Sequence, residues 1–273
     1  MSFKITGSGS FIPSVVENND KFLNNSFCDE SGTEFDIDNQ TIINKFNSIT
    51  GIAERKYISS DLTTSDIAFQ AAKNAIKDAD IDPETLDYII VAHNFGDITC
   101  NSNQIDTLPS LASRVKAKLK IKNPECVAYD ILFGCPGWVE GMIQAQAFMK
   151  AEMAKKCLII GADALSRVID PHDRDSMIYA DGAGATILEN CNLEGGILSH
   201  STLTFTAEDE ADFIFYGESN NKTVCNGDKF IKMQGRKVYE FALINVPAAM
   251  KKCLDHSGIP IENLKKIFIR FWF

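Results

Sequence analysis

Two segments of this chain, 178 residues apart, carry the same pattern of residues. Residues 81–91 align without a gap with residues 259–269, and four of these eleven positions are identical: Ile81/Ile259, Glu84/Glu262, Leu86/Leu264 and Ile89/Ile267. Each segment follows apolar residues at helical spacing and ends in a short apolar run that predicts a strand, at residues 88–92 and 267–269. Four identities can arise by chance, but the matching order of helix, turn and strand favours a duplication. The repeat therefore predicts an α/β chain built from two similar halves.

Very little sequence follows the second copy of the repeat. After Val91 the first copy continues through further predicted helices and strands as far as Leu188, whereas after Ile269 only the four residues 270–273 remain, three of them aromatic. Two interpretations stay open: a chain truncated within its second half, which the aromatic ending favours, or a small second subdomain. We expect two similar halves at residues 1–190 and 191–273, the second of them incomplete.

Cys135 lies at a sharp junction between a predicted strand and a predicted helix. Residues 127–133 form a short apolar run typical of a buried strand, and apolar residues recur at helical spacing from Trp138 onward. Gly134 permits a tight turn, and Pro136 suits the first position of a helix. A helix N-terminus favours the thiolate, which is the nucleophile of acyl transfer. A buried structural cysteine is the alternative, but the turn residues on both sides favour a nucleophile.

The composition is that of a globular protein, with 45% hydrophobic and 23% charged residues. The eight cysteines form no C-x-x-C pair, which predicts reduced thiols in the cytoplasm rather than a disulfide framework or a zinc site. No stretch has the length of a signal peptide core or a transmembrane helix, so we expect no membrane partner.

The charge of the chain argues against a nucleic-acid partner. The formal net charge is −10, whereas phosphate binding needs a basic surface. Five basic residues do alternate along residues 114–122. They predict either a solvated helix face or a docking site for an acidic partner.

Six short segments, in this order and at this spacing, resemble the family of β-ketoacyl-acyl-carrier-protein synthase III, a condensing enzyme of the thiolase fold. They are the opening strand and turn (4–13), T-G-I-x-E-R (50–55), the G-C-P-G-W elbow (134–138), D-P-x-D-R (170–174), D-G-A-G-A (181–185) and M-x-G (233–235). The resemblance implies two pseudo-symmetric halves, each a mixed five-stranded sheet layered with helices.

The resemblance also implies a reaction. An acyl-CoA would acylate Cys135, and malonyl-acyl carrier protein would then lose carbon dioxide and condense with the acyl group, as in fatty-acid chain initiation. The enzyme would need no metal and no cofactor beyond acyl-CoA as substrate, and it would be a homodimer. The family's catalytic His belongs to an H-Q-A-N motif where this chain reads 270–273, and its Asn lies further on. Condensation is therefore expected to be impaired in these 273 residues, and the four histidines that are present are expected to be structural; His93 is expected to be remote from Cys135.

Three basic residues are expected to bind substrates, one because it matches a family position and two because they lie near one. Arg174 corresponds to the arginine that packs against the adenine of CoA, although the tryptophan that accompanies it aligns with Lys45. The family lysine that helps to bind the carrier protein aligns with Glu240, and Arg236 and Lys237 lie one turn earlier, where they can take over this role.

Two other functions stay open. The chain can be an inactive remnant or an interaction partner of an intact synthase. It can also be a related condensing enzyme that makes a specialised lipid, since the predicted CoA site departs from the family pattern.

Overall fold

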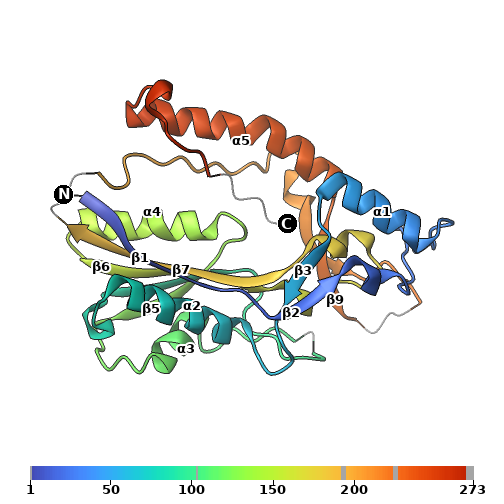
Figure 1. The fold of residues 1–273 in the computed structure, drawn as a ribbon, viewed down its shortest axis with the longest axis horizontal. Helices are drawn as coiled ribbons and strands as arrows, with labels where there is room; N and C mark the ends of the chain where they lie inside the picture. Colours follow the sequence, from blue (N-terminus) through green and yellow to red (C-terminus); the bar gives the residue numbers. More distant parts are fainter. Residues whose placement is uncertain (1, 103, 192–194, 224–226, 269–273) are drawn as a thin grey trace. The chain divides into compact units, whose positions relative to one another are not determined.

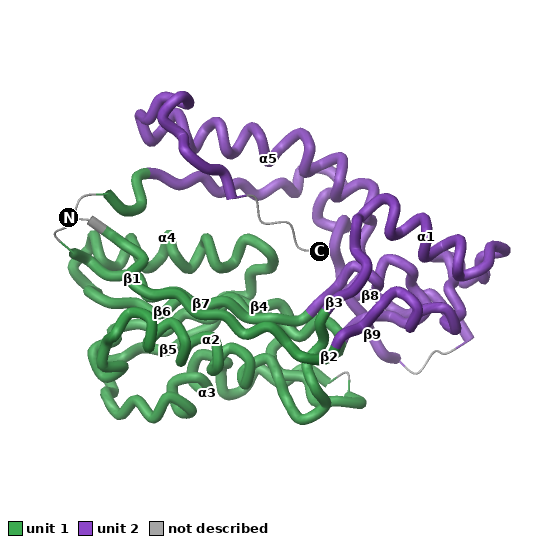
Figure 2. Tube along the Cα trace, viewed as in Figure 1, with its two compact units in different colours: residues 1–15, 56–167, 181–198 green, residues 16–55, 168–180, 199–273 purple. Residues whose placement is uncertain are grey.

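In the computed structural model, residues 2–102, 104–191, 195–223 and 227–268 are described, and they form two compact units (Figure 2). Unit 1 takes in the described residues of 1–15, 56–167 and 181–198; unit 2 takes in those of 16–55, 168–180 and 199–273. This partition differs from the predicted halves, because the segments 16–55 and 168–180 group with the C-terminal residues. The division into halves at residue 190 stays a prediction about the repeat.

Unit 1 is built on a mixed five-stranded sheet (Figure 1). The strand order is β1-β7-β6-β4-β5, with β4 parallel to both of its neighbours and β7 antiparallel to β6 and β1. The strands are β1 (Ser2–Phe11), β4 (Tyr88–His93), β5 (Val127–Leu132), β6 (Lys156–Ala164) and β7 (Asp181–Cys191). The mixed five-stranded sheet predicted for the first half is confirmed.

Helices cover both faces of this sheet. α4 (Gly137–Lys150) lies on one face, and α2 (Thr64–Ala79) and α3 (Leu111–Lys118) lie on the other (Figure 1). The central strands β4 and β6 are therefore buried on both sides, which explains why each reads as a nearly continuous apolar run rather than an alternating one. Leu158 and Ile160 on β6 belong to a large cluster of buried apolar side chains in the core of this unit.

Unit 2 contains fewer strands and a longer helix. Its core packs α1 (Asn39–Thr50) against the segment before it and against the 3₁₀ turn at Arg174–Ile178, through Phe22, Phe27, Ile42, Ile43 and Met177. β8 (Ile214–Glu218) and β9 (Lys229–Met233) form an antiparallel hairpin that leads into α5 (Gly235–Ser257). A separate two-stranded sheet joins β2 (Val15–Asn18) and β3 (Glu54–Tyr57).

The arginine that ends the T-G-I-x-E-R segment has a structural role in unit 2. Arg55 is 4% exposed. Its guanidinium donates hydrogen bonds to the Met177 carbonyl (3.0 Å) and to Asn19 Oδ1 (2.7 Å), and it lies 4.9 Å from the centre of the Phe22 ring. The side chain therefore ties three segments of this unit together.

The repeat is visible in the order of elements. α2 is followed by a 3₁₀ turn at Pro83–Thr85, and α5 is followed by a 3₁₀ turn at Ile261–Asn263, which is the same offset of 178 residues. The first turn leads into β4, whereas residues 264–268 have no regular secondary structure. The strand predicted at 267–269 is thus wrong for residues 267 and 268, because a strand needs a neighbour for its backbone hydrogen bonds; residue 269 lies outside the described residues.

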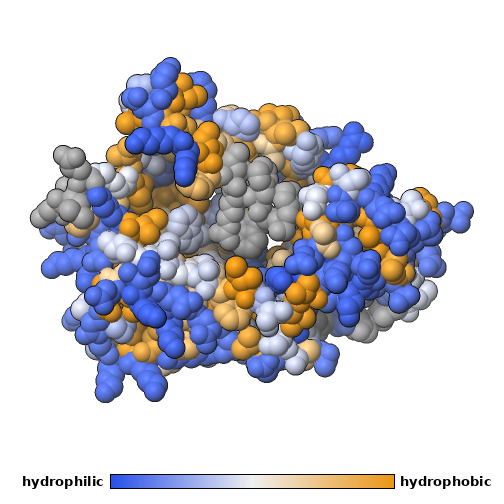
Figure 3. Space-filling view, viewed as in Figure 1, coloured by the Kyte–Doolittle hydropathy of each residue, from blue (hydrophilic) through white to orange (hydrophobic). Residues whose placement is uncertain are grey.

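α5 presents apolar side chains at its surface. Tyr239, Leu243 and Ile244 are 63%, 58% and 72% exposed, and none of the helix residues is buried. Apolar patches are visible along this helix in Figure 3.

Candidate active site

The structure confirms the order of strand, turn and helix predicted around Cys135. The prediction of a buried strand is wrong, because β5 lies at the edge of the sheet and is only partly buried, and Pro136 is the residue before the helix rather than its first residue. The cysteine is exposed and lies between the end of β5 and the start of α4. The turn closes with a hydrogen bond of 2.7 Å from the Gly137 N–H to the Gly134 carbonyl, and the Glu140 N–H donates to the Pro136 carbonyl at 3.1 Å. The thiol is thereby held at the N-terminus of a 14-residue helix, where the helix dipole favours a thiolate.

This elbow, residues 133–137, packs closely on the end of β4. The Phe133 N–H donates to the His93 carbonyl at 3.3 Å. A Cβ atom on Gly137 would lie 2.7 Å from the Ala92 Cβ, which is too close for any side chain to be added without a shift. Glycine at position 137 therefore lets the first turn of α4 approach the sheet.

Trp138 anchors the start of α4 to the sheet. Its indole N–H donates to Thr186 Oγ1 on β7 at 3.1 Å, and its Cβ lies 3.4 Å from the position that a Cβ on Gly161 would take. The aromatic residue of the elbow motif thus fixes the helix that carries the thiol.

His93 is structural, as predicted, but it is not remote from the elbow. It is 1% exposed, and the Gly96 N–H donates to its Nδ1 at 3.0 Å. The proton is therefore on Nε2, which donates to Asp130 at 3.0 Å. Asp130 also accepts hydrogen bonds from the N–H groups of Leu111 and Ala112, both at 2.7 Å, at the start of α3. The imidazole is fully engaged in joining β4, β5 and α3.

The D-G-A-G-A segment is a strand end rather than a phosphate-binding loop. Asp181 opens β7 and is buried, which raises the pKa of its carboxyl group. It accepts hydrogen bonds from the Ser166 N–H and hydroxyl (2.8 and 2.6 Å) and from the Ile58 N–H (2.8 Å). These bonds connect three segments of unit 1, so the aspartate of this motif serves the fold.

Arg174 lines a cavity of about 360 Å³ in unit 2. Its side chain is 52% exposed, its guanidinium lies 4.8 Å from the centre of the Phe35 ring, and its Nε lies 3.8 Å from Asp175 Oδ1. Alignment with the family motif pointed to Lys45 at the position of the aromatic partner. The aromatic ring beside Arg174 in the structure is that of Phe35, which sequence reasoning missed.

The surroundings of Arg174 are acidic. Asp29, Glu30, Asp173 and Asp175 line the same cavity. Burial, and then the charge of Asp173, raise the pKa of Asp175. A phosphate group in this cavity would meet several carboxylates as well as the guanidinium.

The loop that carries Arg174 is held by a buried ion pair. Asp170 is 0% exposed and accepts hydrogen bonds from Lys232 Nζ, Ser219 Oγ (3.0 Å) and the Asn220 N–H (2.7 Å). Burial acts to raise the pKa of Asp170, but the Lys232 ammonium and the backbone donors outweigh it, so the pKa is lowered. Lys232 also contacts Asp173 at 3.0 Å, and the loop is thereby tied to β9.

Arg236 and Lys237 lie in the first turn of α5, close to this loop. A Cβ on Gly235 would lie 3.3 Å from Asp175 Oδ2, so the helix start and the Arg174 loop are neighbours. The Arg236 side chain is 90% exposed and donates to Glu240 at 2.8 Å; Lys237 donates to Asp209 at 2.5 Å. Of the predicted site residues, Arg174, Arg236 and Lys237 thus belong to unit 2, and Cys135 belongs to unit 1.

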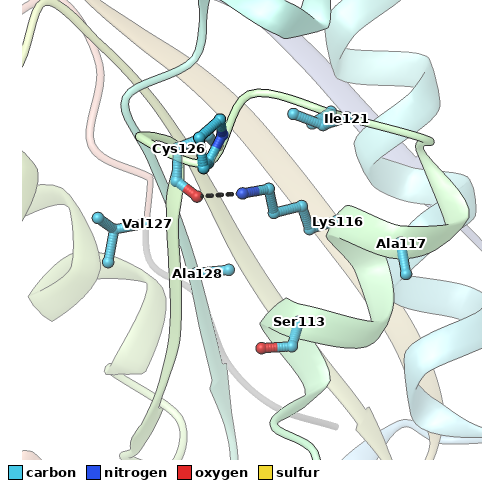
Figure 4. A pocket seen from close by; sticks show the side chains of 8 residues that line it. Ser113, Lys116, Ala117, Ile121, Cys126, Val127 and Ala128 are labelled. Atoms are coloured by element: carbon cyan, nitrogen blue, oxygen red, sulfur yellow. Dashed lines mark hydrogen bonds between the residues drawn. The ribbon is translucent and has the colours of Figure 1, made fainter.

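A second cavity, of about 440 Å³, lies between α3 and the edge strand β5. Figure 4 shows Lys116 reaching the carbonyl of Cys126, a hydrogen bond of 2.6 Å. Two other members of the basic run make ion pairs: Arg114 contacts Asp97 and Asp106, both at 2.7 Å, and Lys118 contacts Asp66. These three of the five basic side chains therefore serve internal contacts.

Neither a metal site nor a membrane span is found among the described residues. No group of three or more His, Cys, Asp or Glu side chains there is arranged to hold a metal ion. None of the helices in that part of the chain is long and apolar enough to cross a membrane.

Known proteins resemble this chain over nearly its whole length. The profile of the family described as 3-oxoacyl-(acyl-carrier-protein) synthase III matches residues 129–205. The β-ketoacyl-(acyl-carrier-protein) synthase III of Erythrobacter litoralis is 30% identical over 264 residues, which cover 95% of this chain and 74% of that protein. The β-ketoacyl-(acyl-carrier-protein) synthase III 1 of Vibrio parahaemolyticus is 35% identical over 269 residues, with 97% and 75% covered.

A solved structure of a synthase III has a fold similar to that of this chain. The crystal structure of 3-oxoacyl-(acyl-carrier-protein) synthase III from Aquifex aeolicus matches with a TM-score of 0.74 at 26% identity, covering 96% of this chain and 74% of that one. The chain therefore belongs to the β-ketoacyl-(acyl-carrier-protein) synthase III family, condensing enzymes of the thiolase fold.

Proposed function

We propose that Cys135 accepts an acyl group from acyl-CoA and passes it to a malonyl group carried by acyl carrier protein. The observation that carries this proposal is the exposed cysteine at the start of α4, behind a turn that packs on the sheet. A rigid elbow of this kind presents the sulfur to a substrate while the helix N-terminus favours its ionised form.

In the first step, the Cys135 thiolate attacks the carbonyl carbon of the thioester. The bond between that carbon and the CoA sulfur breaks, and CoA leaves as a thiolate that water protonates. Backbone N–H groups at a helix start are suited to stabilise the oxyanion of the intermediate. This step draws on the elbow and α4 alone.

In the second step, the malonyl thioester loses carbon dioxide, and the electron pair of the broken bond forms an enolate. The enolate carbon attacks the acyl group on Cys135, and the cysteine leaves as a thiolate. The step needs donors for the enolate oxygen, each of which is worth roughly 10²–10³ in rate. The chemistry also requires Cys135 to be reduced, which favours the cytoplasm.

Basic residues of unit 2 are proposed to bind the two carriers. Arg174, stacked on Phe35, offers a flat surface for the adenine of CoA. Arg236, which is 90% exposed in the first turn of α5, and Lys237 beside it offer positive charge to an acidic carrier protein. No cofactor other than acyl-CoA as a substrate enters the reaction.

A second copy of the chain is the proposed partner of β5. This strand is at the edge of the sheet, where Val127 and Leu132 are 46% and 74% exposed. Edge strands offer backbone groups for pairing with another strand, and two copies related by a two-fold axis can pair their β5 strands.

The first step can be tested by intact-mass spectrometry after incubation with acetyl-CoA and with a medium-chain acyl-CoA. We expect the mass to increase by one acyl group, and we expect Cys135→Ser to abolish the increase. Cys100→Ser is the matched control, since Cys100 is partly exposed but lies outside the elbow. An unmodified chain whose circular dichroism shows it to be folded would contradict the proposal. A preference for the longer donor would favour a specialised lipid product.

A further inference from the structure

The side chain of Asn94 lies directly beneath the elbow. Asn94 follows the last residue of β4. Its amide oxygen Oδ1 is 3.1 Å from the position that a Cβ on Gly134 would occupy, and Gly134 immediately precedes Cys135. The oxygen is thus the nearest side-chain atom to this turn position, and any residue larger than glycine at 134 would press on it.

Asp163, near the end of the neighbouring strand β6, decides which end of the Asn94 amide meets the elbow. Its Oδ1 accepts the Asn94 backbone N–H at 2.9 Å, and its Oδ2 accepts the Asn94 Nδ2 at 2.7 Å. Because an ionised carboxylate only accepts hydrogen bonds, the amide nitrogen must face Asp163. The amide oxygen is therefore the atom that faces Gly134.

A carboxyl group is unfavourable at the position of Asp163. Asp163 is 6% exposed. Burial raises the pKa of its carboxyl group to about 6, although the hydrogen bonds from the two Asn94 donors act to lower it. Burying a carboxyl group costs free energy, and the two hydrogen bonds that Asp163 accepts from Asn94 offset this cost. Its two contacts with one residue, at the base of the nucleophile turn, indicate a positioning role.

We propose that Asn94 and Asp163 form a positioning pair for Cys135, in which Asp163 orients the Asn94 amide and the Asn94 oxygen supports the turn that holds the thiol at the start of α4. This inference rests on the proposed role of Cys135 as the nucleophile. Neither residue touches the substrate in this account: both act through the backbone of the elbow.

For Asp163→Asn, the positioning pair and simple electrostatics predict opposite shifts of the pH at which Cys135 reacts. The variant Asp163→Asn removes a negative charge near the elbow, which by charge alone would favour the thiolate and lower the pH at which Cys135 reacts. In the positioning account, the oxygen that accepts the Asn94 Nδ2 becomes an amide NH₂ group, which cannot accept a hydrogen bond, so the Asn94 amide turns over. The elbow relaxes, and the thiolate loses part of its interaction with α4.

The test measures the rate of Cys135 alkylation by iodoacetamide as a function of pH. For both Asn94→Ala and Asp163→Asn we expect the midpoint of the profile to rise by about half a pH unit, which is the size of a partly lost helix-terminus interaction. The double variant should show no further rise, because the two residues act as one unit. If Asp163→Asn does not fold, Asn94→Ala alone decides the question.

Asp130→Asn is the matched control. Asp130 lies at the same end of the sheet and also binds a β4 side chain, but its partners are His93 and the start of α3 rather than the elbow. This variant should leave the midpoint in place while it lowers the thermal stability. A midpoint that falls or stays unchanged in Asn94→Ala and Asp163→Asn would overturn the positioning pair.

The result can be separated from the proposed function. If the wild-type chain takes up no acyl group but the midpoints rise as expected, the acyl-transfer proposal fails and the positioning pair stands. If the chain is acylated but the midpoints do not move, the reverse holds.

Discussion

At the scale of single residues, the elbow can pack on β4 only because the residue at position 137 is a glycine. Gly137 approaches Ala92 so closely that an added Cβ would lie 2.7 Å from the Ala92 Cβ. Gly184 on β7 is a contrasting case, because an added Cβ there meets nothing within 4 Å.

These two glycines give a matched pair of variants. We expect Gly137→Ala to lower the free energy of unfolding by about 1–3 kcal/mol, since overpacking outweighs the better helix propensity of alanine. We expect Gly184→Ala to change it by less than about 0.5 kcal/mol. Urea denaturation of both variants measures the difference, and equal effects would show that the close packing of the elbow on β4 is wrong.

The buried Asp163 makes stability depend on pH in a defined direction. Its pKa of about 6 in the folded chain exceeds the ordinary value of 3.8, so between these values the folded state binds more protons than the unfolded state. The free energy of unfolding should therefore rise as the pH falls from 7 toward 4, by at most about 3 kcal/mol from this group. Asp163→Asn should remove this contribution.

Urea denaturation of the wild type and Asp163→Asn across this pH range measures the effect. The advantage of the wild type over the variant should grow toward low pH. An advantage that shrinks toward low pH would contradict the raised pKa.

At the scale of elements, the Arg174 loop depends on the ion pair between Asp170 and Lys232. Asp170→Asn leaves the buried Lys232 ammonium with Asp173 as its remaining ion-pair partner, so it should lower the free energy of unfolding by about 1–3 kcal/mol. The exposed pair of Lys251 and Asp255 on α5 is the control, and Asp255→Asn should cost less than about 0.5 kcal/mol. Thermal or urea denaturation compares the two; similar losses would mean that the Asp170 pair is not buried as described.

Local elements were predictable, and the contacts between distant segments were not. The strand, turn and helix around Cys135 follow from the residues 127–150 alone, because hydrophobic period and turn residues are local properties. The stacking of Phe35 on Arg174 and the pairing of Asn94 with Asp163 depend on strand order and loop paths, which no local pattern encodes. The strand expected at 267–269 failed for the opposite reason, since its pattern is local but its hydrogen-bond partners are not.

At the scale of the whole molecule, the edge strand β5 bears on the oligomeric state. If two copies pair through β5, a charged residue at Val127 should weaken the pairing. We expect the wild type to sediment as a dimer and Val127→Lys to shift toward the monomer at the same concentration. A dimer that is unaffected by this change would place the interface elsewhere.

The fold class and the family were predictable at this scale because six short segments occur in a fixed order along the chain. The grouping of residues 16–55 and 168–180 with the C-terminal segment was not predictable, because compact units are defined by contacts rather than by sequence order. The proposed chemistry depends on both a local and a non-local feature. The local motif supplies the thiol of Cys135, and the sheet of unit 1 supports the elbow that holds it.

The most direct test of the central claim locates the acyl group. After incubation with an acyl-CoA, the chain is digested under mildly acidic conditions, and the peptides are analysed by tandem mass spectrometry. We predict that the acyl group is on Cys135 and that hydroxylamine removes it, as expected for a thioester. An acyl group on another cysteine, with Cys135 unmodified, would contradict the account.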